Sequence, residues 1–535
     1  MLFSSVTFLY WFLPVTVGLY YLVPRPGGSL LWRNLLLFLA SVVFYAWGEP
    51  LYILVMLAQA AIGWASGLII GQVPRRVPAG LPGGGDRSAL AAKQGAQDEA
   101  LAPQRAAPST TASRTPLVRF VFVAAVVLEL SSLLFFKYTD FFLANLGALF
   151  NSELRLLALA LPLGISFYTF QILSYTIDLY RGKVSVQRNP LYFATYVTFF
   201  PQLIAGPIVR YADIERQLTQ RVHSFEGFVG GIRRFCIGLG KKVIIANTLG
   251  QLVALAQGSI AAGAAGGYAG TSHVAAASAA VVPEQSMLFA ALFLVAFSLQ
   301  IYFDFSGYSD MAIGLGLMFG FRFPENFRYP FTAASVTDFW RRWHISMSTW
   351  FRDYVYIPLG GNRVSPPRHL LNILAVWMVT GFWHGAGWNF ILWGLYMAAF
   401  LLAEKFLLAR VLERVPSLIR HVYLLIVVAL SWILFESPDL ASASATFEAL
   451  IGWGTGGVSG AASLYYLRDF AAPLAIGAIG CTPLPALAIK KLTETGGHAA
   501  RALTVLEPLF LAAILIVVTA FLVDGSFNPF IYFRF

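Results

Sequence analysis

Long apolar runs without a formal charge recur along this chain of 535 residues, and they constrain its fold more than any other feature. Only 12% of the residues are charged, whereas a soluble globular protein carries about 25%. A soluble fold of this length would lack the charges needed to cover its surface. The runs cover residues 5–23, 35–48, 51–71, 118–136, 156–179, 243–257, 287–303, 371–403, 421–435, 470–489 and 503–523.

These runs predict an all-α polytopic membrane protein with about ten to twelve transmembrane helices. Several runs are shorter than the roughly 20 residues that a helix perpendicular to the membrane needs. We therefore also expect tilted, re-entrant and interfacial helices. The first run begins within five residues of Met1 and follows no basic segment, so it is predicted to be an uncleaved span rather than a signal peptide.

The composition divides the chain into four parts. Residues 1–71 are predicted to form N-terminal transmembrane helices, and residues 118–523 the membrane core. Between them, residues 72–117 are rich in Ala, Gly, Pro, Ser and Gln without apolar periodicity, which is typical of a disordered linker. Residues 524–535 form a short aromatic tail.

The distribution of charge predicts the orientation in the membrane. Residues 181–242 carry ten Lys or Arg against three acidic residues, and residues 322–368 carry seven against three. Residues 257–285 contain no Lys or Arg, and residues 436–469 contain four acidic residues against one Arg. The positive-inside rule places the first two segments, and the 72–117 linker, in the cytoplasm and both termini outside. This rule also explains the net charge of +11 without nucleic acid as a partner.

Residues 370–403 form a run of 34 residues without a formal charge, flanked by Arg368 and Lys405. Basic residues at both ends place both ends on the cytoplasmic side. As a helix the run would be about 50 Å long, too short for two full crossings of a roughly 30 Å hydrocarbon core. A helical hairpin that turns inside the membrane fits, and one long tilted helix is the alternative. The turn would contain Gly381, Gly385 and Gly387.

Two histidines are candidates for proton transfer. His384, in WHGAGWNF, lies within the uncharged run, and an ionisable side chain at membrane depth indicates a functional site. The alternative is a neutral imidazole that joins two helices by hydrogen bonds. His344, in DFWRRWHISMSTWFRDYVYIPLGGNR, lies among aromatic and basic residues typical of interfacial helices. An ordinary interfacial residue is the alternative there.

Other charged residues near these runs have weaker interpretations. The guanidinium groups near His344 are expected either to bind the phosphates of a cytoplasmic donor such as coenzyme A or to contact lipid headgroups. They belong to Arg341, Arg342 and Arg352. Three carboxylates among apolar neighbours are expected to pair with arginines at the membrane boundary. They belong to Asp178, Asp304 and Asp310.

Several enzyme classes find no support in the sequence. There is no GxxxxGK[ST] loop, HExxH motif or GxSxG elbow, so ATP-driven transport, zinc protease chemistry and ordinary serine hydrolysis are not indicated. Cys236 and Cys481 are far apart and provide neither a disulfide framework nor a zinc site. We expect no metal and no bound cofactor.

Three segments resemble the membrane-bound O-acyltransferases, and among them the bacterial branch that acetylates alginate. They are FFPQLIAGPIVRY (199–211), the region 324–363 and WHGAGWNFILWGLY (383–396). The resemblance extends over nearly the whole chain except the 72–116 insert. It implies the fold of that family, with helices around a central tunnel. It also implies that His384 is the principal catalytic histidine and that His344 is the second site position, where family members carry His or Asn.

The resemblance further implies the reaction. A cytoplasmic thioester, most simply acetyl-CoA, would donate its acyl group to an acceptor presented from outside the bacterial inner membrane. His384 would act as general base, and His344 would position or polarise the acyl group. The acetyl group would reach an exported alginate-like polysaccharide through a periplasmic SGNH or esterase-like partner. Transfer of D-alanyl or another acyl group, and a non-enzymatic transporter subunit, are the alternatives.

The tail 524–535 ends in FNPFIYFRF, which contains Tyr532. Such an apolar segment is unlikely to stay in water, and an aromatic interfacial anchor is one interpretation. The tail is also similar to the aromatic tail of the small protein of teichoic-acid D-alanylation. That resemblance implies that the Tyr532 hydroxyl accepts the acyl group as a covalent relay.

Overall fold

The computed structural model describes residues 1–72, 115–264, 286–453, 457–525 and 531. All regular elements in this part of the chain are helical, which confirms the all-α fold. Tyr532 and nearly all of the 72–117 linker lie outside the described residues. The predictions made for them are therefore not tested.

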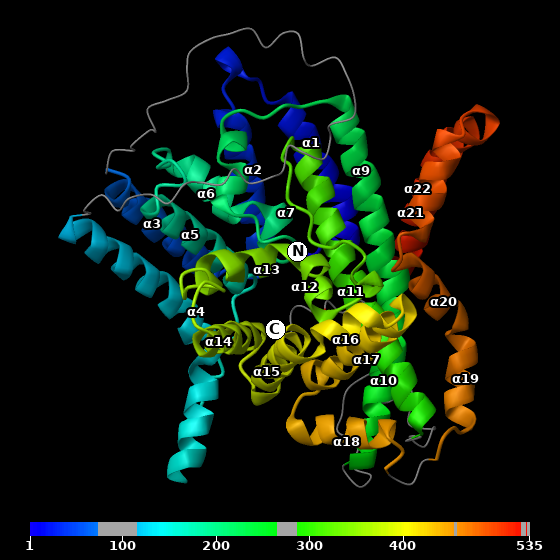
Figure 1. Ribbon diagram of the computed structural model, residues 1–535. Coiled ribbons are helices and arrows are strands. Elements are labelled where there is room, and N and C mark those ends of the chain that lie inside the picture. Colours follow the sequence, from blue (N-terminus) through cyan, green and yellow to red (C-terminus); the bar gives the residue numbers. More distant parts are fainter. Residues whose placement is uncertain (73–114, 265–285, 454–456, 526–530, 532–535) are drawn as a thin grey trace.

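The N-terminal helices form one side of the molecule (Figure 1). Helix α4 begins directly after Thr115, whose hydroxyl accepts a hydrogen bond from the Val118 amide. The helix extends beyond residue 136, where the apolar run was expected to end, because Lys137 is one of its helical residues. The helices are α1 (Leu13–Leu22), α2 (Leu31–Ala46), α3 (Ile53–Ile70), α4 (Pro116–Phe150), α5 (Ile165–Tyr180), α6 (Pro190–Thr198), α7 (Phe200–Leu203) and α8 (Tyr211–Ile214).

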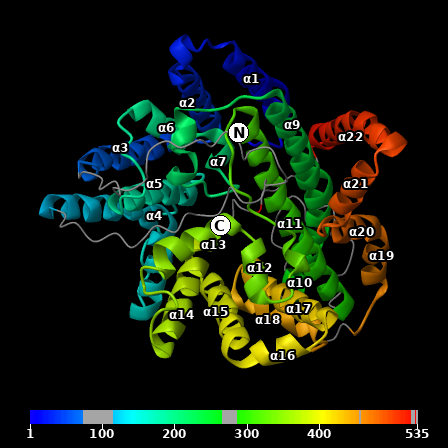
Figure 2. The ribbon, with the colours of Figure 1, turned by 45° about the horizontal axis from the view of Figure 1, so that its top comes forward.

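Helix α11 (Met287–Met318) crosses the centre of the molecule beside α9 (Phe225–Gly240) (Figures 1 and 2). The two backbones approach so closely that a Cβ atom at Gly238 would lie 2.5 Å from the Gly307 carbonyl oxygen. Small residues permit this kind of helix contact in membranes. A π-helical turn, η4 (Lys241–Ala246), joins α9 to α10 (Asn247–Ala264).

Short helices follow α11 and lie near the centre of both views (Figures 1 and 2). Ser335 caps α12 (Val336–Arg342) by accepting a hydrogen bond from the Asp338 amide at 3.0 Å. Helix α13 (Ile345–Phe351) then continues into a π-helical turn, η6 (Arg352–Tyr356).

Helices α14 (Pro366–His384) and α15 (Trp388–Ala403) form a hairpin, as expected for the uncharged run. The chain turns at 385–387. A Cβ atom at Gly381 would overlap the Phe390 carbonyl oxygen, and one at Gly394 would overlap that of Trp377. Glycine at both positions therefore lets the two helices pack tightly.

The remaining helices complete the C-terminal side. They are α16 (Ala409–Arg414), α17 (Ser417–Glu436), α18 (Leu440–Leu450), α19 (Ala461–Asp469), α20 (Ala471–Gly480), α21 (Leu484–Glu494) and α22 (Gly497–Val523). Figure 1 shows α19 to α22 at the margin of the molecule, away from the hairpin. Helices α20 and α21 are bent by 62° relative to each other.

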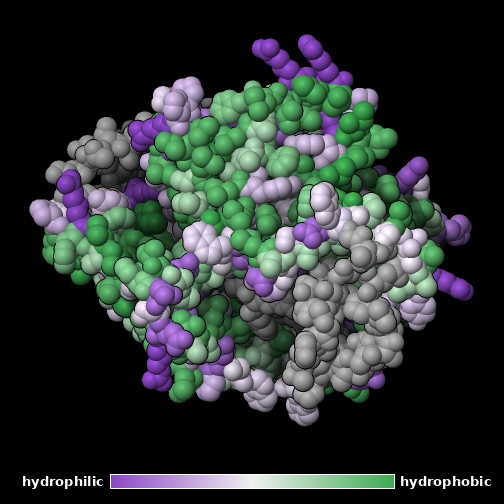
Figure 3. Space-filling view, turned by 90° about the horizontal axis from the view of Figure 1, so that it is seen from below, coloured by the Kyte–Doolittle hydropathy of each residue, from purple (hydrophilic) through white to green (hydrophobic). Residues whose placement is uncertain are grey.

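Seven helices in the described part of the chain are long and apolar enough to cross a membrane, or eight if the bent pair α20–α21 is one span. This number is smaller than the ten to twelve expected, because several apolar runs fold as shorter helices. Residues 156–179, for example, become helical only from Ile165 onward. Figure 3 shows apolar side chains over much of one face, as expected where lipid chains are the solvent.

Candidate active site

The end of α14 is held by two side chains of α4. The Lys137 ammonium group donates hydrogen bonds to the carbonyl oxygens of Trp383 at 2.6 Å and His384 at 3.1 Å. The Tyr138 hydroxyl donates to the Phe382 oxygen at 2.8 Å. A cation at the C-terminus of a helix satisfies free carbonyls and complements the helix dipole. The position of His384 is therefore fixed by α4, which the sequence analysis did not connect with the site.

The His384 imidazole is surrounded by aromatic rings. Its exposed fraction is 6%, and its ring centroid lies 4.9 Å from that of Trp383, 5.2 Å from Trp393 and 5.3 Å from Phe435. Its Nδ1 atom has no hydrogen-bond partner among the described residues. A buried polar atom is rarely left unpaired in a purely structural role, so this nitrogen favours the functional interpretation over helix cross-linking.

His344 is also buried, with an exposed fraction of 1%, and is not the surface residue that its aromatic and basic neighbours in the sequence suggested. It precedes α13 with a φ of 44°, a strained conformation for a residue with a side chain. Its ring packs against Phe305 of α11 at a centroid distance of 4.6 Å. This long-range contact explains the error, because local composition carries no information about it.

Asn326 fixes the orientation of the His344 ring. Its amide nitrogen donates to the Gly206 carbonyl oxygen at 3.3 Å and to Ser309 Oγ at 3.1 Å. Its Oδ1 therefore faces His344 Nδ1 at 3.2 Å and also accepts from Ser346 Oγ at 2.8 Å. Because an amide oxygen can only accept, His344 Nδ1 carries the hydrogen and Nε2 is left as an acceptor. Sequence analysis missed Asn326, which lies in PENF without an apparent pattern.

Both histidines line one small cavity of about 20 Å³, which we call the histidine cavity. This volume admits about one water molecule. Its other lining residues are aromatic or apolar except Asp304. They are Ile301, Asp304, Phe305, Trp340, Trp343, Trp393, Trp432, Phe435 and Ile531.

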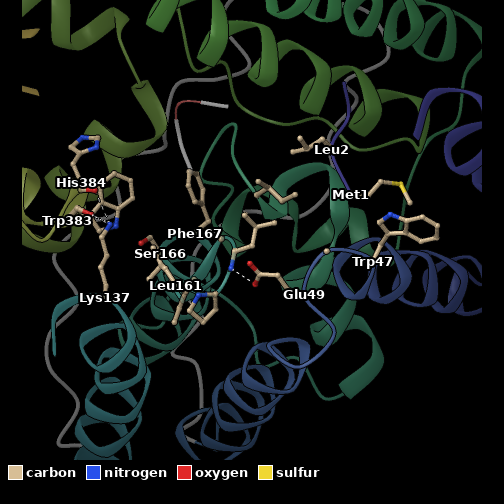
Figure 4. Close-up of a pocket in the computed structure, with 16 residues that line it drawn as sticks. Met1, Leu2, Trp47, Glu49, Lys137, Leu161, Ser166, Phe167, Trp383 and His384 are labelled. Atoms are coloured by element: carbon tan, nitrogen blue, oxygen red, sulfur yellow. Dashed lines mark hydrogen bonds between the residues drawn. The ribbon is translucent and has the colours of Figure 1, made fainter. Parts of the chain in front are cut away.

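A larger cavity of about 470 Å³ opens on one side of His384 (Figure 4). We call it the Glu49 cavity. Its two charged side chains are engaged within the protein. Glu49 accepts hydrogen bonds from the Leu163 amide at 2.7 Å and the Tyr45 hydroxyl at 3.4 Å, and Lys137 binds the end of α14. His384 is thus shared between the histidine cavity and the Glu49 cavity.

A third cavity of about 520 Å³ adjoins Trp340, which also lines the histidine cavity. We call it the Lys405 cavity. Lys405 lies 3.2 Å from His369 Nε2, and the His369 ring is held by the Tyr356 hydroxyl at 2.9 Å. The cavity is also lined by Glu404, whose carboxylate accepts hydrogen bonds from the backbone amides of Val336 and Thr337. The rest of the lining is largely apolar and includes Met347, Phe351, Ile373, Val376, Trp377, Leu401 and Leu412.

The three candidate arginines occupy different places. Arg352 lines the Lys405 cavity, and its Nε donates to Asp353 Oδ1 at 2.7 Å. Arg342 instead pairs with Asp338 at 3.0 Å, and Arg341 is exposed. Neither of these two lines any of the three cavities. Of the three candidate arginines, the structure therefore brings only Arg352 to one of these cavities, where Lys405 adds a second cation that the sequence analysis did not single out.

Asp353 holds Arg352 in place and is itself strongly paired. Burial alone would raise the pKa of its carboxyl group, but hydrogen bonding and charge from Arg352, with the charge of Arg210, outweigh burial and lower that pKa. The Arg210 guanidinium lies 2.9 Å from Asp353 Oδ2. The carboxylate is therefore charged at neutral pH.

The three carboxylates expected to pair with arginines do so only in part. Asp310 accepts from Arg234 at 2.9 Å, as expected, and also from Lys241 at 2.7 Å. Asp304 pairs with Lys242, which belongs to the π-helical turn η4. The expectation of an arginine partner was wrong for Asp304, because the packing of η4 against α11 brings Lys242 to this carboxylate.

Asp178 has no arginine partner among the described residues either. Its carboxylate accepts from the Tyr354 hydroxyl at 2.6 Å and lies 3.7 Å from the Lys183 ammonium group.

Cys236 and Cys481 are both free and buried.

The chain matches the model of the membrane-bound O-acyltransferase family, MBOAT, over residues 127–441, which is more than half of its length. It therefore belongs to the membrane-bound O-acyltransferase family. The protein is a multi-pass membrane enzyme that transfers acyl groups, as the shared motifs predicted. Family membership favours the enzyme over the alternative of a transporter subunit.

Relatives of known name place it within this family. The protein named probable alginate O-acetylase AlgI of Pseudomonas aeruginosa is 37% identical over 459 residues, 85% of this chain and 76% of that protein. A peptidoglycan O-acetyltransferase of Helicobacter pylori is 31% identical over 482 residues, 84% and 80% of the two chains. A teichoic acid D-alanyltransferase of Bacillus subtilis is 30% identical over 257 residues, 46% and 59% of the two chains.

Proposed function

We propose that the protein moves an acetyl group from a thioester donor in the Lys405 cavity, through the histidine cavity, to an acceptor hydroxyl in the Glu49 cavity. One observation carries this proposal. The histidine cavity shares Trp340 with the Lys405 cavity and His384 with the Glu49 cavity. Each of the two larger cavities therefore has one lining residue in common with the small cavity that both histidines line.

His384 acts as general base in this mechanism. The aromatic rings around it disfavour the charged imidazolium, which keeps the neutral form that a base requires. As the acceptor oxygen forms a bond to the acyl carbon, its proton passes to His384. The carbon–sulfur bond breaks, and the proton then goes from His384 to the departing thiolate. His344, oriented by Asn326, positions the acyl carbonyl group.

The charges of the Lys405 cavity support a phosphate-bearing donor. Arg352 and Lys405 lie at its wall, and both cations bind phosphate well. The adjoining apolar surface suits the alkyl part of a pantetheine chain. Acetyl-CoA is the simplest donor of this kind. The charge pattern of the sequence makes this side cytoplasmic in a bacterial inner membrane, with both chain termini outside.

The acceptor is an exported polysaccharide in this proposal. The relative from Pseudomonas aeruginosa is named for alginate and the one from Helicobacter pylori for peptidoglycan, so a cell-envelope glycan is the shared class. An alginate-like polymer fits the identity over 85% of the chain. A periplasmic SGNH or esterase-like partner would complete the transfer. D-alanyl transfer is the second candidate, supported by the shorter match to the D-alanyltransferase.

Purified protein in lipid vesicles tests this proposal. Thiol release from acetyl-CoA and appearance of acetyl ester on added alginate oligosaccharide, with and without the periplasmic partner, are measured together. The same assay with a D-alanyl carrier protein compares the two donors. Thiol release from acetyl-CoA but not from the D-alanyl carrier protein would support acetyl transfer. Release only from the carrier protein would overturn it in favour of D-alanyl transfer.

Tyr532 is proposed as the first acceptor on the outer side. The phenolic oxygen would form an ester with the acyl carbon while the thiolate leaves and His384 carries the phenolic proton to it. The Tyr532→Phe variant deletes only the hydroxyl and keeps the aromatic ring. We expect it to lose polymer acetylation as fully as a His384 variant. Acetylation near the wild-type level would show that the tail is only an aromatic anchor.

A further inference from the structure

A buried ion pair adjoins the histidine cavity. Lys242 in the turn η4 and Asp304 in α11 lie 2.5 Å apart, and each side chain has an exposed fraction of 3%. The Lys242 ammonium group also donates to Asn247 Oδ1 at 3.0 Å. Asp304 lines the histidine cavity together with both histidines.

The second oxygen of Asp304 binds the backbone of Ile531. Asp304 Oδ2 accepts a hydrogen bond from the Ile531 backbone amide at 3.0 Å. Ile531 is 7% exposed and lines the same cavity as His344 and His384. The two residues are 227 positions apart in the sequence, so this contact joins Ile531 to the central helix α11.

Burying an ion pair is costly, and apolar residues of similar size often stabilise a protein as well or better. Charged residues inside a membrane protein therefore point to a function. Here one carboxylate oxygen lies beside Lys242, which neutralises the charge, and the other accepts from the Ile531 backbone amide. A charged acceptor makes such a hydrogen bond stronger than a neutral one would.

We propose that Asp304, held by Lys242, is a positioning residue that fastens Ile531 as part of the wall of the histidine cavity. The wall keeps the cavity narrow and excludes bulk water from the thioester, so that the acyl group passes to its acceptor rather than to water. This inference rests on the proposed function, because it assigns Ile531 a place in the acyl-transfer site.

The test uses the full chain in lipid vesicles and two readouts. The first is deuterium exchange of the C-terminal peptide that contains residue 531. The second is the ratio of acyl transfer to thioester hydrolysis, both measured from the same acetyl-CoA reaction. A merely structural role would change the yield of folded protein without changing this ratio.

The main variant replaces the pair by apolar residues, Lys242→Leu with Asp304→Leu, which leaves no buried charge uncompensated. We expect the residue 531 amide to exchange at least ~10-fold faster and the transfer-to-hydrolysis ratio to fall by about 10-fold. The matched control is Lys241→Met with Asp310→Asn, which removes the neighbouring pair while Arg234 keeps its bond to Glu325. It should leave both readouts unchanged.

A second pair of variants tests the amide itself. Ile531→Pro removes the N–H group that donates to Asp304, whereas Ile531→Val keeps it with nearly the same side chain. We expect Ile531→Pro to lower the ratio as the double variant does and Ile531→Val to preserve it. The inference would be overturned if the transfer-to-hydrolysis ratio were the same in the double leucine variant, its control double variant, Ile531→Pro and Ile531→Val. Unchanged deuterium exchange in the double leucine variant would overturn it as well.

These outcomes are separate from a failure of the proposed function. If His384→Ala retains normal acyl transfer, the proposed function is wrong, yet the exchange of the 531 amide still reports whether Asp304 holds Ile531. If His384→Ala abolishes transfer and the double leucine variant changes neither readout, only the positioning role of Asp304 is wrong.

Discussion

The Lys405 cavity and the Glu49 cavity have similar volumes, about 520 and 470 Å³, but they differ in how their charges are used. Glu49 and Lys137 are bound to backbone groups of the protein itself, so they stabilise the cavity wall. The Arg352 side chain, by contrast, is 57% exposed, and Lys405 lies at the wall of its cavity. This difference favours the Lys405 cavity as the one that binds an anionic donor in the proposed reaction.

The largest expected effect comes from His384, where the histidine cavity and the Glu49 cavity meet. We expect His384→Ala to lower the rate of polymer acetylation by about 10³-fold, because general base catalysis contributes roughly 10²–10⁴-fold. The measurement is acetyl ester on the polymer at matched levels of inserted protein. His421→Ala is the control, since this histidine bonds to the Ala333 carbonyl oxygen away from the three cavities. Normal acetylation in His384→Ala would mean that His384 is structural.

Reversing two charges tests the difference between the two cavities directly. We expect Arg352→Glu with Lys405→Glu to raise the KM for acetyl-CoA by about 10–100-fold, because hydrogen bonds to charged groups contribute roughly 1.5–3 kcal/mol. The kcat should change little. The control is Arg341→Glu with Arg342→Glu, which alters two arginines of the same region that line none of the cavities. If both double variants raise KM equally, the effect is a general one of surface charge.

Sequence analysis predicted the parts of this molecule that depend on local pattern. The apolar runs predicted helices, the glycines between residues 381 and 387 predicted the hairpin turn, and the motif around His384 predicted the family. Each of these depends on residues that lie in one continuous stretch of the sequence. The structure and the family match confirm them.

Parts that depend on long-range packing were not predictable in this way. His344 was expected at the interface, but it is buried because Phe305 and Asn326 pack against it from distant segments. Lys137 was treated as the end of a span, although a lone lysine among apolar residues signals a functional or capping role. Lys405 was considered only as a basic residue that flanks the uncharged run 370–403. Its place in a cavity follows from how α15 lies against α12, which no local pattern records.

The orientation of His344 provides the next prediction. We expect Asn326→Ala to lower kcat by about 10-fold with KM unchanged, because one buried hydrogen bond to the ring is lost. His344→Asn should retain more activity than His344→Ala, since an amide still offers a donor and an acceptor. Single-turnover kinetics with acetyl-CoA measure the chemical step. A rise in KM for the donor without loss of kcat would assign Asn326 to donor binding instead of the orientation of His344.

The smallest expected effect concerns the residue that holds Arg352. Asp353→Asn weakens the contact between Asp353 Oδ1 and Arg352 Nε, and we expect the KM for acetyl-CoA to rise by about two- to five-fold, as for a partly exposed ion pair. Asp213→Asn is the matched control, because Asp213 shares Arg210 with Asp353 but does not touch Arg352.

A lowered pKa means that the Asp353 carboxylate is charged throughout the neutral range. Its stabilising contribution is therefore present above the ordinary carboxyl pKa of about 3.9 and is lost only as the pH falls further, through the lower pKa of the folded protein. The difference in KM between wild type and Asp353→Asn should accordingly stay constant between about pH 5 and 8. A difference that vanishes within this range, or an equal rise in KM for Asp213→Asn, would contradict a role of Asp353 in positioning Arg352.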